Sequence, residues 1–181
     1  RVERHSTTED SPFSRMIEEM TFDARQLQNI PFSDAEKRIE VLTHLPRVIL
    51  GARTEADFLM RVAQLLLAGI PRAEAVAIVE PSASTCEVLC GERRTETAGL
   101  VRPSMRLVRE AVLTSRRSVL HIWEPSAASD ARYTAIAEFG WAFCTPVFVP
   151  GEPQRGLYVA GRHEFQCGNP LSASIGRHLR Q

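Results

Sequence analysis

Cysteines are the residues of this sequence best suited by type to covalent chemistry, and the chain has four of them. Cys86 and Cys90 lie in the alternating segment Thr85-Cys-Glu-Val-Leu-Cys, which is typical of a β-strand. Four residues of strand span about 13 Å, which exceeds the Cα separation that a disulfide allows. Apolar strand positions also disfavour the thiolate that a nucleophile needs. We therefore predict free, buried thiols in a reducing cytoplasm.

Motifs that would support catalysis or metal binding are absent from the sequence. No Ser-His-Asp set, Walker loop, HExxH or CxxC pattern occurs, so we predict no catalytic residues. His121 and Cys144 fall on different predicted strands, but no spacing of histidine and cysteine matches a known metal cluster. We interpret them as a half-buried histidine and a core thiol, and we predict no metal site. The sequence does not identify a cofactor.

A segment between two predicted strands is a candidate for one wall of a ligand pocket. Residues 125–138 are small and polar, and rich in Ala and Ser. The residues that would line a pocket between this segment and the sheet are Trp123, Arg132, Tyr133, Phe139 and Cys144. Aromatic walls with one cation suit a small planar or anionic ligand. The alternative is that these aromatic side chains only fill the core.

The bulk composition is that of an ordinary globular protein. Of the 181 residues, 44% are hydrophobic and 24% are charged, which argues against a disordered chain. Lys plus Arg equals Asp plus Glu at 22 each, so the net charge does not support a nucleic-acid partner or an anionic membrane surface. No apolar run approaches the roughly 18 residues of a membrane span, and no signal peptide opens the chain. Because the chain starts at Arg1 and its last segment has a helical pattern, we expect a piece of a longer protein.

Helical and strand-like patterns alternate along the chain. Apolar residues at helical spacing predict helices over 12–30, 33–51, 54–69 and 104–113, and a last helix after Pro170. Short apolar or alternating runs predict strands over 75–79, 86–90, 119–123, 142–149 and 156–161. This order of elements predicts an α+β domain with a mainly antiparallel sheet.

The helix predicted before Gly51 carries an apolar stripe on one face, formed by Ile39, Leu42, Leu45 and Ile49. Its start is marked by the capping-box spacing Ser33-Asp-Ala-Glu36, and Pro46 is expected to interrupt or kink it. The stripe packs either within the chain or against a second copy. We favour a second copy, paired also through the last helix.

Four stretches, taken in order, resemble the GAF domain family over roughly Asp34 to Phe165. They are Thr54-Glu-Ala-Asp-Phe-Leu, Ala73-Glu-Ala-Val-Ala-Ile-Val, Val108 to Leu113 with Thr114-Ser-Arg-Arg-Ser-Val-Leu-His-Ile, and Phe143-Cys-Thr-Pro-Val-Phe-Val-Pro-Gly with Gly156-Leu-Tyr-Val. The resemblance implies a PAS-related, six-stranded antiparallel sheet with helices on one face and a small-molecule pocket on the other. It also implies three parts: an N-terminal linker and helical segment (1–33), the GAF domain (34–166) and the start of a C-terminal signalling helix (167–181).

Two further segments, Met16-Ile-Glu-Glu-Met and Arg38-Ile-Glu-Val-Leu-Thr-His-Leu-Pro, resemble the GAF region of bacterial multidomain signalling proteins. Those proteins often carry a forkhead-associated domain upstream and a class III adenylate or guanylate cyclase downstream. The implied function is a cytoplasmic sensory or regulatory domain that binds a small molecule, forms a homodimer through its N- and C-terminal helices, and controls a fused effector such as a nucleotide cyclase.

Two other functions are compatible with the same resemblance. One is a dimerisation and signal-relay module without a ligand. The other is an enzyme like the GAF-fold free methionine sulfoxide reductases, but the cysteine-bearing loop of those enzymes is missing from this sequence. The cysteine context of bilin-binding members and the Asn-Lys-Phe-Asp-Glu signature of cyclic-nucleotide-binding members are missing too, so the ligand stays unidentified.

Overall fold

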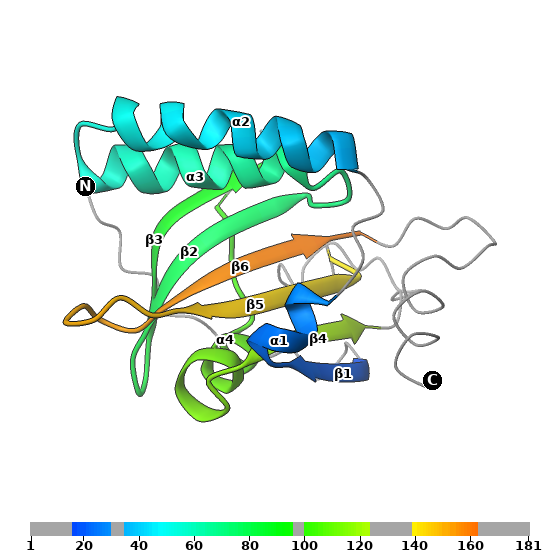
Figure 1. Cartoon of the computed structure of the whole chain (residues 1–181). Helices are drawn as coiled ribbons and strands as arrows, with labels where there is room; N and C mark the ends of the chain where they lie inside the picture. Colours follow the sequence, from blue (N-terminus) through cyan, green and yellow to red (C-terminus); the bar gives the residue numbers. More distant parts are fainter. Residues whose placement is uncertain (1–15, 30–34, 96–99, 124–138, 163–181) are drawn as a thin grey trace.

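Six antiparallel strands form a single sheet in the computed structural model, which describes residues 16–29, 35–95, 100–123 and 139–162 (Figure 1). The strands are β1 (Met16–Phe22), β2 (Ala75–Pro81), β3 (Cys86–Arg93), β4 (Ser118–Trp123), β5 (Trp141–Val147) and β6 (Arg155–Gly161). Their order across the sheet is β1-β4-β5-β6-β2-β3, and every neighbouring pair is antiparallel. The predicted α+β class and the six-stranded antiparallel sheet are confirmed.

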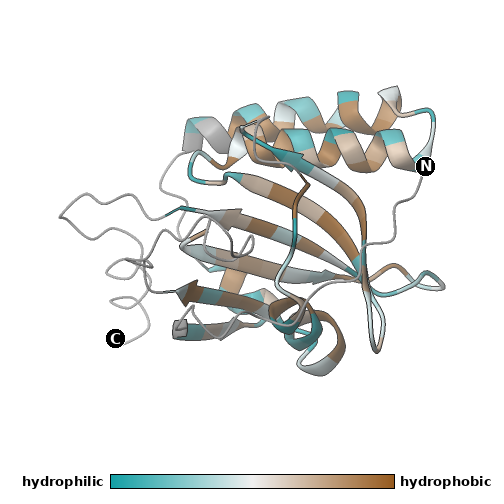
Figure 2. Cartoon of the chain, turned by 180° about the vertical axis from the view of Figure 1, so that it is seen from behind, coloured by the Kyte–Doolittle hydropathy of each residue, from teal (hydrophilic) through white to brown (hydrophobic). Residues whose placement is uncertain are grey.

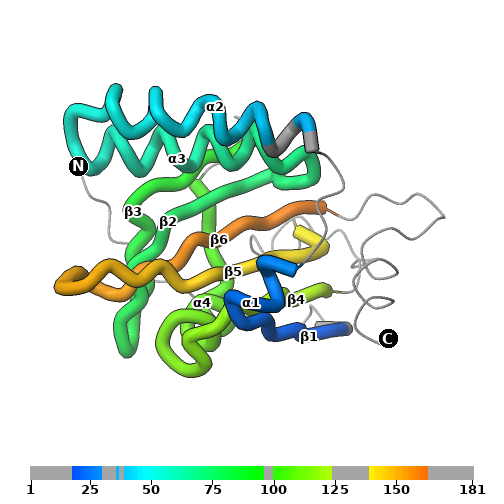
Figure 3. Tube along the Cα trace, in the orientation of Figure 1, coloured from blue at the N-terminus to red at the C-terminus, as the bar shows by residue number. Residues whose placement is uncertain are grey.

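Helices lie on both faces of this sheet. They are α1 (Ala24–Gln28), α2 (Ala35–Gly51), α3 (Glu55–Gly69), α4 (Met105–Arg109) and the π-helical turn η2 (Glu110–Thr114) that continues α4. The α3 helix packs on β2 and β3, and α2 packs on α3 as an outer layer (Figure 3). The α4 helix and η2 lie against the opposite face, which we call the α4 face.

The N-terminal segment corrects one sequence prediction. Met16–Phe22 was expected to be helical, but it forms β1 and pairs with β4 along the edge of the sheet. The apolar residues there fit a helical spacing, yet Met20 and Phe22 also alternate, and pairing satisfies the backbone groups of an edge that β4 would otherwise leave open. A helix begins only at Ala24, where Asp23 and Gln26 form a capping box with two bonds of 2.8 Å.

The α2 helix runs unbroken through Pro46, so the expected interruption does not occur. The predicted cap at Ser33 lies outside the described residues. At the other end the helix finishes at Gly51, as the sequence predicts.

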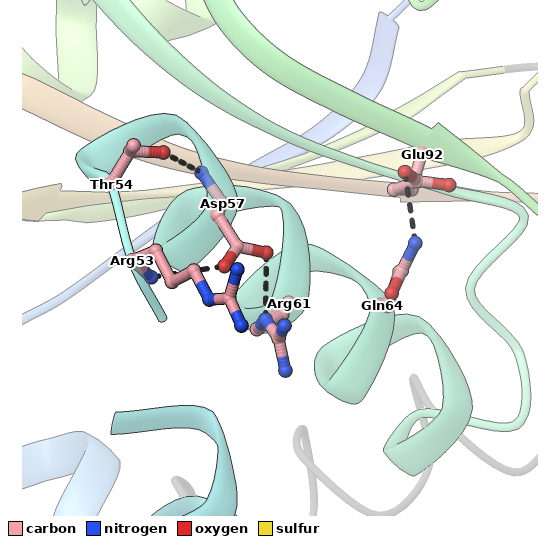
Figure 4. Close-up of polar contacts among 6 residues, drawn as sticks. All are labelled: Arg53, Thr54, Asp57, Arg61, Gln64 and Glu92. Carbon is pink, nitrogen blue, oxygen red and sulfur yellow. Dashed lines mark hydrogen bonds and ion pairs between the residues drawn. The ribbon is translucent and has the colours of Figure 1, made fainter. Parts of the chain in front are cut away.

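The α3 helix begins as predicted, with Thr54 as its cap. The Thr54 hydroxyl accepts a hydrogen bond of 3.1 Å from the Asp57 backbone N–H (Figure 4). The Asp57 carboxylate in turn accepts 2.7 Å and 3.1 Å bonds from the Arg61 side chain and the Arg53 backbone N–H. These bonds hold the pKa of Asp57 below its usual value. The bond from the Arg61 side chain has the largest effect, and the bond from the Arg53 backbone has the next largest.

Alternating side chains of the strands form two hydrophobic cores, one on each face. On the helical face, Ala63 and Leu67 of α3 pack against Val76 of β2 and Val159 of β6. The larger core lies on the α4 face, between the sheet and residues such as Leu107, Val108 and Val112. Figure 2 views the chain from this second side and shows the hydrophobic residues along the central strands.

The helix predicted over 104–113 forms, but its second half is a π-helix. Ser104 caps it by accepting a bond from the Leu107 N–H, and the Ser115 N–H donates to the Glu110 carbonyl at 2.8 Å. Gly156 makes this close packing feasible, since a Cβ there would lie 2.8 Å from Val112. The segment 125–138 and the last predicted helix lie outside the described residues.

Candidate functional site

Three of the five predicted pocket residues gather on the α4 face. Trp123, Phe139 and Cys144 belong to one core cluster, with 6%, 6% and 0% of their surface exposed. Arg132 and Tyr133 lie outside the described residues. These burial values mean that a ligand among the three side chains would be enclosed by protein rather than held at the surface.

Register places a row of small side chains in the same core as these aromatics. Ala75, Ala160 and Ala142 are direct cross-strand partners on β2, β6 and β5, and all three are buried in the α4-face core. The row continues to Arg93 on β3 at one end and to His121 on β4 at the other. Since directly paired residues point to the same side of a sheet, one row carries a cation, three alanines and a histidine.

Arg93 is a site residue that the sequence analysis missed. Its guanidinium carbon lies 5.3 Å from the centroid of the Phe139 ring, which is cation–π geometry. Arg93 and Phe139 are far apart in the sequence, and only the register Arg93–Ala75–Ala160 brings them to one end of the sheet. The α4 face therefore contains a cation beside an aromatic ring among the described residues, whereas Arg132, the cation of the predicted pocket, lies outside them and stays a prediction.

His121 is more buried than predicted. It was expected to be half-buried, but only 1% of its surface is exposed because α4 and the sheet enclose it. Its Nε2 atom lies 3.1 Å from a carboxylate oxygen of Glu19, its partner on β1, and Arg106 of α4 lies 3.8 Å from the same oxygen. The ring also meets Trp123 edge-on, with centroids 5.8 Å apart. This cluster joins the edge strand, the sheet and α4.

The three cysteines among the described residues are poor nucleophiles in this arrangement, and Cys167 lies outside that part of the chain. Cys86, Cys90 and Cys144 are free thiols. Burial raises the pKa of Cys86 to about 11, and burial followed by the neighbouring Cys86 raises the pKa of Cys144 still further. Burial and then Glu92 also raise the pKa of Cys90. Near pH 7 these thiols are protonated, so none of them supplies a thiolate.

Neither a metal-binding cluster nor a membrane-spanning helix occurs among the described residues. No group of three or more His, Cys, Asp or Glu side chains there is arranged to hold a metal ion. None of the helices in that part of the chain has both the length and the apolar composition to cross a membrane.

The helical face carries a second candidate site, an exposed stripe on α2. Ile39, Leu42 and Ile49 have 64%, 52% and 60% of their surface exposed, whereas Leu45 is half-buried. Val48 is buried and Val41 half-buried, because that side of α2 packs on α3. One side of α2 is therefore buried against α3, and the adjacent side exposes aliphatic residues to solvent.

Two arginines attach α3 to the sheet. Near its end, Arg94 donates to the carbonyls of Leu67 at 2.6 Å and Ile70 at 3.0 Å, and to that of Ala73 at 2.8 Å. At its start, Arg155 of β6 contacts the Glu55 carboxylate at 2.6 Å. With both ends held and its middle in the core, α3 is a fixed support for α2.

Comparisons with known proteins bear on the fold. No protein-family model matches the sequence, and a search of curated proteins finds no match. Among solved structures, the Nlh2 GAF domain of A. aeolicus in an inactive state superposes with a TM-score of 0.53 at 14% identity, covering 79% of this chain and 87% of that one.

Two GAF domains of cyanobacterial phytochromes also superpose, each over 81% of this chain and 91% of theirs. The phycoerythrobilin-bound domain has a TM-score of 0.49 at 10% identity, and the phycocyanobilin-bound domain has 0.45 at 11%. The fold assignment rests on the A. aeolicus domain together with the strand order and helix placement described above. The described residues have the fold of a GAF domain.

Proposed function

We propose that this chain is a regulatory domain that forms a homodimer through α2 and controls a fused effector. The exposed stripe of Ile39, Leu42 and Ile49 carries the proposal. These residues recur at intervals of three and seven, so they form a straight seam along a 17-residue helix. Aliphatic side chains in such a seam are stabilised when a second copy removes them from water.

Charge placement on α2 also favours self-pairing. The exposed residues Glu40, His44 and Arg47 lie on the side of the helix away from the seam, as the helical period of 3.6 residues requires. A second copy therefore meets aliphatic residues along the seam, without like charges opposed at its centre. The predicted C-terminal helix, which lies outside the described residues, is the second contact of the proposed dimer.

Light scattering on the purified chain tests this proposal. Wild type is expected to show a dimer of about 40 kDa at micromolar concentration, twice the 20.2 kDa of one chain. Leu42→Asp places a charge in the seam and should yield a monomer with unchanged circular dichroism. His44→Asp puts the same charge on the opposite side of α2 and should leave the dimer intact. A monomeric wild type, or two variants that behave alike, would rule out pairing through α2.

Small-molecule binding on the α4 face is the second part of the proposed function. Its support is the core cluster that Trp123 and Phe139 share with the alanine row, with the Arg93 guanidinium beside the Phe139 ring. Arg132, Tyr133 and Cys144 complete the proposed lining. A cation next to aromatic walls suits a small planar anion. The alternative, relay without a ligand, leaves these residues as core only.

A thermal-shift screen separates the two alternatives. A ligand that binds the folded chain stabilises it and so raises the melting temperature. At a ligand concentration of one hundred times the Kd, the stabilisation is about 2.7 kcal/mol. Nucleotides, bilins, haem and common metabolic carboxylates form the panel. A hit should be lost in Arg93→Gln and kept in Arg72→Gln, an exposed arginine in the turn after α3. No shift across the panel favours the relay module.

The remaining parts of the proposal concern context. Free thiols at Cys86, Cys90 and Cys144 support a reducing, cytoplasmic location. Their raised pKa values argue against a thiol-based methionine sulfoxide reductase. A nucleotide cyclase is the proposed effector, and the reading frame downstream of Gln181 tests it directly. An output domain of another class there would replace the cyclase without affecting the dimer.

A further inference from the structure

The tip of the β5–β6 hairpin exposes three consecutive apolar residues. Val147, Phe148 and Val149 have 40%, 55% and 50% of their surface exposed. The turn that follows is closed by a 3.1 Å bond from the Glu152 N–H to the Val149 carbonyl, and Gly151 supplies a φ of 83°. Figures 1 and 2 show this hairpin projecting beyond the end of the sheet. Single exposed apolar residues are ordinary, but three in a row on a projecting tip indicate a contact surface.

Exposed arginines surround the base of this hairpin. Arg116 and Arg117 immediately precede Ser118, whose hydroxyl lies 2.7 Å from that of Thr145 near the end of β5. They therefore stand at the same end of the sheet as the tip. Arg116 adopts a φ of 52°, in the left-handed region of a tight turn.

A third arginine reaches the same end from the helical layer. Arg53 lies two residues before Glu55, whose carboxylate is held at 2.6 Å by Arg155, the register partner of Val147. The turn itself contributes one carboxylate, Glu152. Other acidic groups also lie at this end: Arg155 contacts Glu55 and Glu80, and Arg61 contacts Asp57. The exposed cations next to the tip are therefore chiefly Arg116 and Arg117.

We propose that this tip docks the domain on an anionic lipid surface, with Phe148 and Val149 entering the interface and the arginines contacting headgroup phosphates. The shape of the tip favours lipid over a second copy of the chain. A projecting apolar turn needs a matching hollow in a protein partner, whereas a fluid interface closes around it. Arginines next to the inserted side chains are attracted by anionic lipid at about 1 kcal/mol each, or roughly fivefold in partitioning per residue.

Co-sedimentation with vesicles tests the proposal on the full chain. Vesicles of phosphatidylcholine with 30% phosphatidylserine should pellet the protein more strongly than pure phosphatidylcholine, and 0.5 M NaCl should reduce the difference. Phe148→Asp should lower the partition coefficient at least tenfold, and Arg116→Ala about fivefold. Met60→Asp removes an exposed apolar residue from α3 instead, outside both the tip and the α2 seam, and should leave binding unchanged.

A fluorescence readout keeps the test independent of pelleting. Phe148→Trp should show a blue shift of its added emission with the anionic vesicles and none with buffer. Equal pelleting of wild type and Phe148→Asp would overturn the proposal, as would no blue shift for Phe148→Trp. Self-association that Phe148→Asp abolishes in the absence of vesicles would assign the tip to a contact between copies, which also overturns it.

Discussion

Arg94→Ala should destabilise the fold more than any other exposed substitution that we consider. The Arg94 guanidinium donates to the carbonyls of Leu67, Ile70 and Ala73, at 2.6, 3.0 and 2.8 Å. The first two belong to the end of α3, where backbone carbonyls have no partner within the helix and where a positive charge is favoured by the helix dipole. One arginine therefore supplies bonds to the Leu67 and Ala73 carbonyls and a second bond to the Ile70 carbonyl, which also accepts from the Ala73 N–H at 3.0 Å.

The loss of stability expected for Arg94→Ala depends on how exposed Arg94 is to water. A hydrogen bond from a charged donor is worth about 1.5–3 kcal/mol, but the bonds of one side chain do not add. Arg94 is exposed, so water can reach the carbonyls after the substitution, and we expect a total loss of about 2 kcal/mol. For a chain of this size that corresponds to a fall in melting temperature of about 4–8 °C.

Urea denaturation followed by circular dichroism measures this loss. Arg94→Lys should recover only part of it, since an ammonium group lacks the planar fork that reaches several carbonyls at once. Arg72→Ala removes an exposed arginine from the neighbouring turn and should change stability by less than about 0.5 kcal/mol. The reasoning fails if Arg94→Ala and Arg72→Ala have the same midpoint, or if Arg94→Lys is as stable as wild type.

Three other substitutions test the packing and electrostatics of the fold. Gly161→Ala would place a Cβ 2.2 Å from the Arg72 carbonyl and 2.5 Å from Trp141, so we expect a cost of about 3 kcal/mol or more in urea denaturation. Gly151→Ala, with open space but a φ of 83°, should cost about 1 kcal/mol and is its control. Because burial raises the pKa of Cys86 from 9.0 to about 11, the unfolded thiol ionises first, and stability should fall as the pH rises from about 9 to about 11. That fall should be shallower in Cys86→Ala; an unchanged slope would show that Cys86 is not its source. Arg155→Met should cost only about 1 kcal/mol, because the Glu55 carboxylate it contacts is mostly exposed; a double-mutant cycle with Glu55→Gln measures the coupling.

Local signals in the sequence predicted most of the elements. The Thr54 cap, the end of α3 at Gly69 and the strands around Val76, Val119 and Leu157 follow from capping rules and from hydrophobic patterning. These features depend on residues within a few positions of each other, which is why the pattern sufficed. The order of α and β segments then restricted the fold to an antiparallel sheet with helices on its faces.

The N-terminal strand shows where local reasoning ends. The residues from Met16 to Met20 satisfy a helical period, but their conformation is decided by the open edge of β4 a hundred residues later. No signal within the segment reports that edge.

The sequence predicted the kinds of residue at the candidate site better than it predicted which residues these are. Trp123, Phe139 and Cys144 were selected for their chemistry and fall in one cluster. Arg93 was missed because its place beside Phe139 depends on the register of β3, β2 and β6. Register follows from which face each strand buries, and a single sequence does not state which strands are neighbours.

The attachment of α3 to the sheet restricts the path that the proposed signal would take through this domain. Because Arg155 and Arg94 hold both ends of α3 to the sheet and Leu67 packs in the core, α3 should move with the sheet rather than slide on it. Among the described helices and strands, α3 is the element against which α2 packs extensively. A ligand on the α4 face would therefore reach the α2 seam through a change in the sheet that carries α3 with it. If the sheet has one arrangement in the monomer and another in the proposed dimer, the ligand shifts the monomer–dimer equilibrium only by the difference in its affinity for these two arrangements. Arg155→Met loosens one end of this connection, so it should weaken the coupling between ligand and dimer while leaving each separate equilibrium near its wild-type value.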